Sequence, residues 1–139
     1  MARSLFKPPA TMNDSVRRVL FVDDDAVIRM ITGALLQRAG YEVANAEDGA
    51  EALRIVESEP SFDLIVTDLD MPNVDGRTLL TTLRSRETTA STPVVILSGS
   101  NDATMHAALL EAGALACITK PINPATFVEQ LHSALRASN

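Results

Sequence analysis

Five short apolar runs alternate with stretches of helical spacing along this chain. The runs occupy residues 18–22, 41–46, 63–67, 93–97 and 117–119. Three of them are rich in Val, Ile and Leu without strict alternation, which is typical of strands buried on both faces of a parallel sheet. The second run, YEVANA, does alternate, and this pattern predicts a half-exposed strand at the edge of the sheet.

The stretches between the runs carry apolar residues three and four positions apart, the spacing of helices with one buried face. Gly40 and Gly113 follow the first and fourth stretches, where a left-handed C-terminal residue is expected. Asn123 and Pro124 suit the start of the last helix. The predicted inward-facing positions are Ile28, Ile31 and Leu35; Ala52, Leu53 and Val56; Leu79, Leu80 and Leu83; Met105, Leu109 and Ala112; and Phe127, Val128, Leu131 and Leu135.

This alternation of strands and helices predicts the fold class and the domain organisation. Five strand–helix units indicate an α/β fold, a doubly wound five-stranded parallel sheet with five helices on its two faces and right-handed crossovers. Residues 1–15 show no period and contain Pro8-Pro9, so we expect a flexible extension or a remnant of an expression tag there. Residues 16–139 are then a single domain.

Composition narrows the classes of partner. The 139 residues include 18 acidic and 12 basic side chains, a net charge of −6, and residues 1–18 hold four of the bases against one acid. The remaining body is too acidic to hold a nucleic acid backbone by itself. Cys117 is the only cysteine, which excludes an internal disulfide and suits a reducing compartment. With no apolar run near the ~20 residues of a membrane span and no signal-peptide pattern, we expect a cytoplasmic protein.

Polar residues stand at the carboxyl ends of four predicted strands. Ligands of doubly wound folds bind beyond these ends, where the strand order reverses, so we expect these residues to converge. Three or more carboxylates in one crevice repel one another and raise one another's pKa, so a cation should neutralise them. Mg²⁺ with oxygen ligands fits best, with Mn²⁺ as its substitute. The residues are Asp23-Asp24-Asp25, then Asp68 and Asp70, then Ser98-Gly99, then Lys120-Pro121.

Each of these residues by itself also has a simple structural explanation. Asp25 is expected only to begin a helix, Asp68 alone suits a cap, and Ser98-Gly99 alone indicates a turn. Lys120 differs, because it is the only lysine after residue 7 and places a compact charge at a strand end. The combination, with each residue at the correct end of its strand, favours a functional site.

Four segments resemble the signature blocks of the response-regulator receiver domain of two-component signalling: VLFVDDD, LIVTDLDMPNVDG, VVILSGS and ACITKP. The resemblance covers residues 16–137 and keeps the order of every block. It implies a flavodoxin-like sheet of order 2-1-3-4-5, as in chemotaxis regulators. It further implies a signalling switch controlled by phosphorylation, which catalyses only its own phosphorylation and dephosphorylation and is otherwise not an enzyme.

The resemblance also implies roles for individual residues. Asp68 is similar to the phosphoacceptor, which attacks the phosphohistidine of a sensor histidine kinase or phosphotransfer protein. Asp24 is similar to the direct Mg²⁺ ligand and Asp23 to a residue acting through water. Asp68 also belongs to the implied metal site, as does Asp70 through its main-chain carbonyl. Lys120 resembles the lysine that pairs with a phosphoryl oxygen, and Ser98 the hydroxyl that binds the phosphoryl group and draws the next loop inward.

Two departures from the family concern how the signal leaves the site. Many members carry an aromatic switch residue where this chain has Cys117, and an acidic pair where it has Leu115-Ala116. We therefore expect the response to run through the loop of residues 98–102 and the start of the fourth helix, with Gly99 supplying backbone freedom. Cys117 alternatively only fills the core, with output through another face. The downstream protein or output domain is not specified by the sequence.

Two other classes of protein share part of the pattern. Phosphatases of the haloacid dehalogenase type also follow a buried strand with Asp-x-Asp, as in Asp68-Leu69-Asp70, but their acidic pair comes last and they usually carry a cap domain. A receiver-like interaction module that no longer uses phosphate usually lacks an acidic residue or the lysine. Because Asp23-Asp24 comes first here and every residue is present, the motif order favours the phosphorylated switch.

Overall fold

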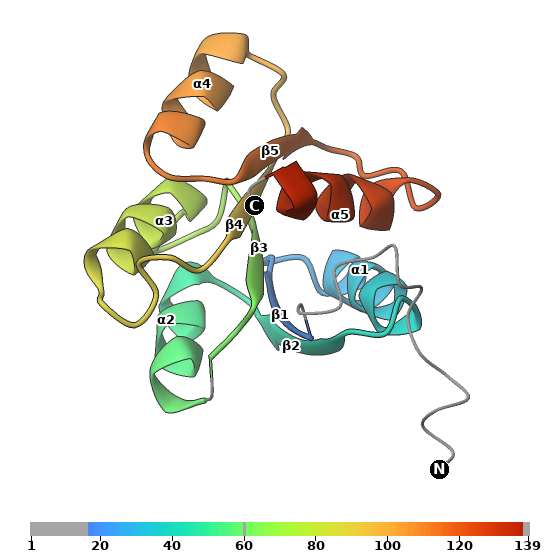
Figure 1. The fold of residues 1–139 in the computed structure, drawn as a ribbon, viewed down its shortest axis with the longest axis horizontal. Helices are drawn as coiled ribbons and strands as arrows, with labels where there is room; N and C mark the ends of the chain where they lie inside the picture. Colours follow the sequence, from blue (N-terminus) through green and yellow to red (C-terminus); the bar gives the residue numbers. More distant parts are fainter. Residues whose placement is uncertain (1–16, 60, 138–139) are drawn as a thin grey trace.

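In a computed structural model, which describes residues 17–59 and 61–137, one parallel sheet lies between two layers of helices (Figure 1). The strand order is β2-β1-β3-β4-β5, so the predicted fold is confirmed. The expected extension at residues 1–15 lies outside the described residues. The elements are β1 (Arg18–Val22), α1 (Ala26–Arg38), β2 (Glu42–Ala46), α2 (Gly49–Ser58), β3 (Leu64–Asp68), α3 (Gly76–Ser85), β4 (Val94–Ser98), α4 (Ala103–Glu111), β5 (Ala116–Thr119) and α5 (Phe127–Ala137).

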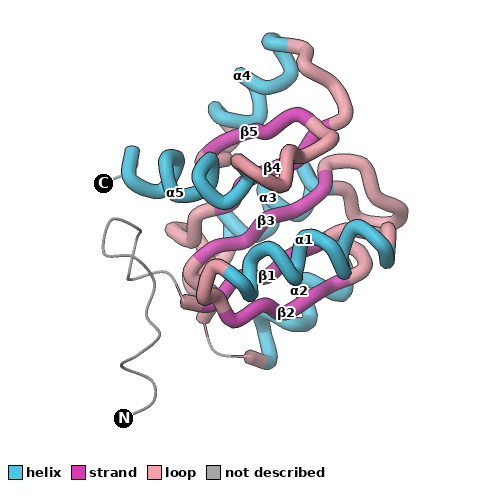
Figure 2. The backbone as a smooth tube through the Cα atoms, turned by 90° about the vertical axis from the view of Figure 1, so that its right-hand side faces the viewer, coloured by secondary structure: helices cyan, strands magenta, loops and turns pink. Residues whose placement is uncertain are grey.

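The two faces of the sheet bury two separate cores. Helices α1 and α5 cover one face, in front of the strands in Figure 2, and α2, α3 and α4 cover the other. Successive side chains of a strand point to opposite faces. In β1, Val19 and Phe21 therefore join the α1/α5 core, while Leu20 and Val22 join the core under α2, α3 and α4. This two-sided burial explains why the central strands β1, β3 and β4 are apolar without alternation.

The edge strand predicted from YEVANA is confirmed. β2 pairs with β1 in parallel and lies at the end of the sheet, and its residues Glu42 and Asn45 are exposed. β5 forms the opposite edge, where Ala116 and Cys117 are only partly buried. None of the described helices is both long enough and apolar enough to cross a membrane.

The buried face of α1 differs from the predicted one. Ile31, predicted to face inward, is 46% exposed, and its neighbours Val27 and Met30 are exposed as well. The helix instead buries Thr32, Gly33 and Leu36, with Ile28 and Leu35 partly buried. The prediction was wrong because it counted only apolar residues, whereas Thr32 and Gly33 occupy the centre of the face that meets the sheet.

Helix termini follow the local sequence. Gly40 and Gly113 have φ angles of 102° and 117°, the left-handed conformation predicted after α1 and α4. The first four helices each have an aspartate N-cap whose side chain accepts backbone N–H groups: Asp25, Asp48, Asp75 and Asp102. Asn123 accepts a hydrogen bond from the Ala125 N–H, so it caps a turn that leads into α5.

Candidate functional site

Four strand ends meet at one edge of the sheet. Asp23 follows β1, Asp68 is the last residue of β3, Ser98 is the last of β4, and Lys120 follows β5. Parallel pairing of Val22 with Thr67 places the next residues, Asp23 and Asp68, side by side. The strand order reverses between β1 and β3, because β2 lies on one side of β1 and β3 lies on the other. Doubly wound folds bind ligands in the crevice at such a reversal, beyond the carboxyl ends of the strands, and these four residues lie there.

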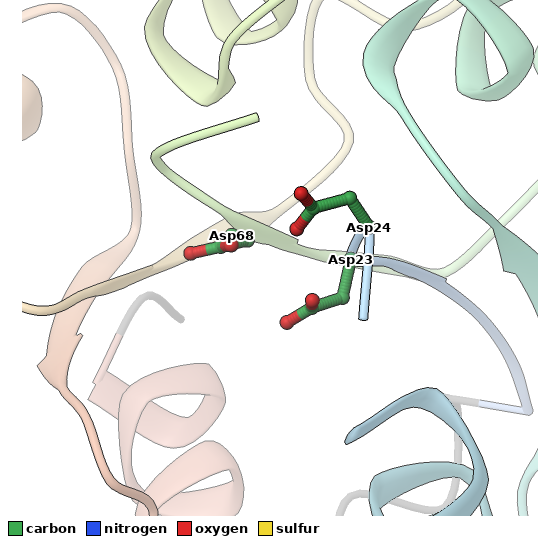
Figure 3. A group of neighbouring side chains, drawn as sticks. All are labelled: Asp23, Asp24 and Asp68. Carbon is green, nitrogen blue, oxygen red and sulfur yellow. The ribbon is translucent and has the colours of Figure 1, made fainter. Parts of the chain in front are cut away.

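Three carboxylates gather at the ends of β1 and β3 (Figure 3). One oxygen from each of Asp23, Asp24 and Asp68 lies within 4.8 Å of the others, and Asp23 and Asp68 are buried while Asp24 is exposed. The Asp25 N–H donates to Oδ1 of Asp23 at 2.9 Å, but the buried Oδ2 has no donor among the described residues. An oxygen in that position suits a divalent cation with oxygen ligands.

The electrostatics of Asp23 support this interpretation. Burial raises the pKa of the Asp23 carboxyl above its ordinary value, and the charges of Asp68 and Asp24 raise it further. The Asp25 N–H and the Lys120 ammonium oppose that change without cancelling it. The ionised form of Asp23 therefore lacks sufficient positive charge from the described residues around it.

Lys120 places the positive charge of its side chain next to Asp68. Its Nζ donates to Oδ1 of Asp68 at 2.9 Å, and the Asp68 side chain is 5% exposed. Burial by itself lowers the pKa of Lys120, but the hydrogen bond to Asp68 and the nearby charges, Asp23 included, outweigh it, so the pKa lies above its ordinary value. Lys120 is therefore charged at neutral pH, with its ammonium directed at the carboxylate of β3.

The backbone around Asp68 is held closely. The Leu69 N–H donates to the carbonyl of Leu97 at 2.9 Å, and Thr67 Oγ1 donates to the carbonyl of Asp68 at 2.9 Å. A β-carbon placed on Gly76 would lie 2.4 Å from that same carbonyl oxygen, so only glycine lets the start of α3 approach β3. Gly76 is the last residue of the LIVTDLDMPNVDG segment, and nothing in the sequence pattern predicted this close approach.

Ser98 is fully buried and bonds to its own loop. Its Oγ donates to the carbonyl of Ser100 and accepts the Ser100 N–H, both at 3.1 Å. Gly99 is exposed, and a β-carbon there would have no neighbour within 4 Å among the described atoms, so packing does not require glycine. Cys117 packs partly buried against the α2/α3/α4 core, and burial raises the pKa of its thiol.

Two further residues lie near the acidic cluster, Asp70 in the chain after β3 and Arg29 on α1. Asp70, two positions after Asp68, is exposed, and its carboxylate is not one of the three that gather at the strand ends. Arg29 from α1 donates through Nη1 to the carbonyl of Asp23 at 2.5 Å, a contact that sequence reasoning missed. Its only sequence signal is its place one turn after the Asp25 cap, which brings it back over the end of β1.

Comparison with protein families identifies the arrangement. The family model described as the response regulator receiver domain matches residues 19–132. The chain belongs to this family. A receiver domain is a phosphorylation-dependent signalling switch of two-component systems and not a conventional enzyme. The resemblance stated from the four sequence blocks is thereby confirmed, and neither the phosphatase nor the phosphate-independent module is favoured.

Curated relatives include a transcriptional regulatory protein and a two-component response regulator, both longer than this chain. Transcriptional regulatory protein PrrA of Mycobacterium tuberculosis is 41% identical over 120 residues, which are 86% of this chain and 50% of that protein. Two-component response regulator ORR7 of Oryza sativa subsp. japonica is 39% identical over 107 residues, 77% of this chain and 51% of that protein. The chain therefore spans about half the length of these relatives.

Solved structures of response regulators superpose on most of this chain and on nearly all of their own length. The chemotaxis response regulator CheY4 of Vibrio cholerae superposes with a TM-score of 0.80 at 33% identity, covering 86% of this chain and 98% of that one. A CheY-like receiver domain protein of Methanospirillum hungatei superposes with a TM-score of 0.78 at 31% identity, covering 88% and 95%. The similarity to CheY4 therefore extends over nearly all of that chain.

Proposed function

We propose that Asp68 is the residue of this receiver that is phosphorylated, by a phosphohistidine of a sensor histidine kinase or phosphotransfer protein. The observation that carries the proposal is the ion pair between Asp68 and Lys120 at 2.9 Å, directly beside the carboxylates of Asp23 and Asp24. Together, these residues provide a nucleophile, a positive charge and a cluster of oxygens suited to a metal ion at the carboxyl ends of the strands.

The chemistry follows from these groups. A carboxylate oxygen of Asp68 attacks phosphorus, the P–N bond to the donor imidazole breaks, and the imidazole leaves with its bonding electrons and takes up a proton. Phosphoryl transfer spreads negative charge over the three equatorial oxygens, so positioning and electrostatic stabilisation provide most of the catalysis. Lys120, charged and aimed at Asp68, is placed to pair with one of these oxygens.

The acidic cluster is proposed to hold Mg²⁺, with Mn²⁺ as a substitute. Asp23, Asp24 and Asp68 would hold it through carboxylate oxygens, directly or through water, together with the main-chain carbonyl of Asp70. The buried, unpartnered Oδ2 of Asp23 supports this assignment. When bound, the ion supplies positive charge to the phosphoryl oxygens.

The donor must reach Asp68 from the open side of the crevice and so covers the residues around it. Helix α1 lies beside the site, because its Ile31 lines the same cavity as Lys120, and α1 exposes the apolar side chains of Val27, Met30 and Ile31. This apolar cavity has a volume of about 480 Å³. Apolar residues there suit contact with a helical protein donor. The cavity is lined by Ile28, Ile31, Thr32, Leu97, Lys120, Pro121, Ile122 and Pro124.

The last part of the proposal concerns where the phosphorylated domain acts and what it controls. The phosphorylated domain is proposed to act in the cytoplasm, where ATP-dependent kinases form phosphohistidine, and to control a downstream protein or output domain without itself holding nucleic acid. The acidic balance of the chain, 18 acids against 12 bases, supports that last point.

Intact-mass measurement tests the proposal. With Mg²⁺ and a small phosphodonor such as phosphoramidate, the protein should gain the mass of one phosphoryl group, in a linkage that base hydrolyses as it does an acyl phosphate. Asp68→Asn should not gain it, whereas Asp70→Asn, which changes an exposed carboxylate outside the cluster, should. Equal labelling of Asp68→Asn and the parent would assign the acceptor to another residue.

A further inference from the structure

The loop between β4 and α4 converges on a single residue, Ser100. Its N–H donates to Ser98 Oγ at 3.1 Å, and its Oγ accepts the Asp102 N–H at 3.1 Å. Its carbonyl oxygen accepts from Ser98 Oγ at 3.1 Å and lies 2.7 Å from Nε2 of His106 on α4. Because a carbonyl is only an acceptor, Nε2 of His106 must carry the proton and donate it.

Ser98 and His106 thus share one acceptor, although only Ser98 belongs to the phosphorylation site. A hydroxyl has a single proton to donate. If Ser98 donates that proton to a phosphoryl oxygen on Asp68, its bond to the Ser100 carbonyl is lost. Two contacts then still join Ser100 to α4: the bond from His106 to its carbonyl, and the bond from the N–H of the N-cap Asp102 to its Oγ. Of these, only the bond from His106 holds the Ser100 carbonyl that Ser98 has left.

Helix α4 is lightly held at its beginning and tied at its end. Leu109 is its only fully buried residue, and Ala103 and Thr104 in its first turn are exposed. Figure 1 shows the helix at the rim of the molecule beside β5. Just beyond its C-terminus, Arg84 of α3 donates through Nε and Nη2 to the carbonyl of Gly113, at 3.3 and 2.9 Å. The end of α4 is therefore tied to α3, whereas its first turn is held by the Asp102 cap, the bond from His106 and the partial packing of Met105.

We propose that His106 is a positioning residue that transmits displacement of Ser100 to the first turn of α4. The inference rests on the proposed function of Asp68, since phosphorylation there is what redirects the Ser98 hydroxyl. The hydrogen bond from His106 makes the loop and the first turn move as one body, with the Arg84–Gly113 contact as the fixed end. This route uses no aromatic side chain at position 117.

Substitutions at His106 can separate the hydrogen bond from simple packing. His106→Phe keeps a ring of similar size but removes the donor, whereas His106→Gln keeps an N–H donor on a chain of similar reach. Thr104→Ala is the matched control, because Thr104 is exposed in the same turn and its hydroxyl makes no hydrogen bond among the described residues.

Amide hydrogen exchange with and without beryllofluoride and Mg²⁺, a phosphoryl mimic, provides the test. In the parent and in Thr104→Ala, exchange should change both in residues 98–102 and in the first turn of α4, at Thr104, Met105 and His106. In His106→Phe the loop should still respond while the response of α4 is lost, and His106→Gln should restore it. Thermal melts of all variants check that they fold.

The outcomes of this experiment separate the proposed role of His106 from the proposed role of Asp68. A full response of α4 in His106→Phe, or a lost response in Thr104→Ala, would overturn the role of His106 while leaving Asp68 as the acceptor. Absence of any response to beryllofluoride and Mg²⁺ in the parent would overturn the proposed function and, with it, this inference. Failure of His106→Gln to restore the response would show that the hydrogen bond is not what transmits the displacement.

Discussion

The α-carbon of Gly76 approaches the main chain of Asp68 so closely that an added β-carbon would lie 2.4 Å from the Asp68 carbonyl oxygen. The same β-carbon would lie 2.8 Å from the α-carbon of Leu69. Neither neighbour is a flexible side chain that can move aside. The first residue of α3 therefore fixes the backbone position of the proposed acceptor.

Gly76→Ala should consequently be costly. The methyl group forces α3 away from β3, and overpacking of this kind typically costs 1–3 kcal/mol of unfolding free energy, more than the ~1 kcal/mol that Ala gains over Gly in a helix. Urea denaturation measures the loss, and phosphodonor labelling should slow as Asp68 shifts. Gly99→Ala is the control, because the structure leaves open space there, and it should stay within about 0.5 kcal/mol of the parent. Equal stability of the two variants would contradict the packing argument.

Asp23→Asn should stabilise the metal-free protein and abolish its response to Mg²⁺. The change removes one of three crowded negative charges whose burial is unfavourable, so the metal-free variant should gain about 1 kcal/mol. In the parent, millimolar Mg²⁺ should raise the melting temperature by preferential binding to the folded state. Thermal melts with Mg²⁺ and with EDTA measure both effects. A melting temperature of Asp23→Asn that still rises with Mg²⁺ as in the parent would count against Asp23 as part of the metal site.

Acidification should destabilise the domain through His132. This side chain is buried in α5 and hydrogen-bonds Tyr41, and burial lowers its pKa, with Arg136 adding to that effect and Glu129 opposing it. Below the ordinary His value of 6.5 the unfolded chain takes up a proton that the folded chain does not, so stability falls as pH falls. The slope from His132 can reach about 1.4 kcal/mol per pH unit.

Urea denaturation between pH 7 and pH 5 measures that slope, and His132→Phe should reduce it by removing the titrating group. A parent slope that His132→Phe leaves unchanged would assign the acid sensitivity to other groups.

Ile31→Lys should impair transfer from a protein donor more than from a small one. Ile31 is 46% exposed on α1 beside the apolar cavity, and a charge placed in a docking contact loses apolar burial. We expect roughly tenfold weaker transfer from a phosphotransfer protein, equivalent to about 1.4 kcal/mol, with unchanged labelling by phosphoramidate. Leu110→Lys is the matched control, since Leu110 is also 46% exposed but lies on α4. Equal effects of the two substitutions would exclude α1 as the specific docking surface.

The sheet and the edge at which the site lies could be predicted because both follow from local rules. Strands buried on both faces read as continuous apolar runs, and parallel strands bring their carboxyl ends together. The third strand was predicted to end in Asp68, and this is confirmed, with Asp68 itself buried in the sheet. The roles of Asp23, Asp24, Asp70, Ser98 and Lys120 stay predictions, since geometry shows where these residues lie but not what they do.

The contacts that the sequence did not predict are made between elements far apart in the chain or by residues counted as polar. His132 was not predicted to lie in the core, because a histidine interrupts an apolar pattern. Its hydrogen-bond partner Tyr41 lies 91 positions away, so no local pattern indicates that contact. The Arg29 contact depends on how α1 lies over β1, and the outward position of Ile31 depends on which face of α1 meets the sheet. Periodicity does not specify either of these.

Asp25 links helix nucleation to the state of the acidic cluster. Its side chain accepts the N–H groups of Val27 and Ile28 at the start of α1, while its own N–H donates to the carboxylate of Asp23. Forming the first turn of a helix is the unfavourable step, and a cap favours it. Fraying of that turn would therefore release Asp23 at the same time. A protein that docks on α1 and rigidifies its first turn would thus order the carboxylate of Asp23, which we propose to bind the metal, at a distance and without touching it.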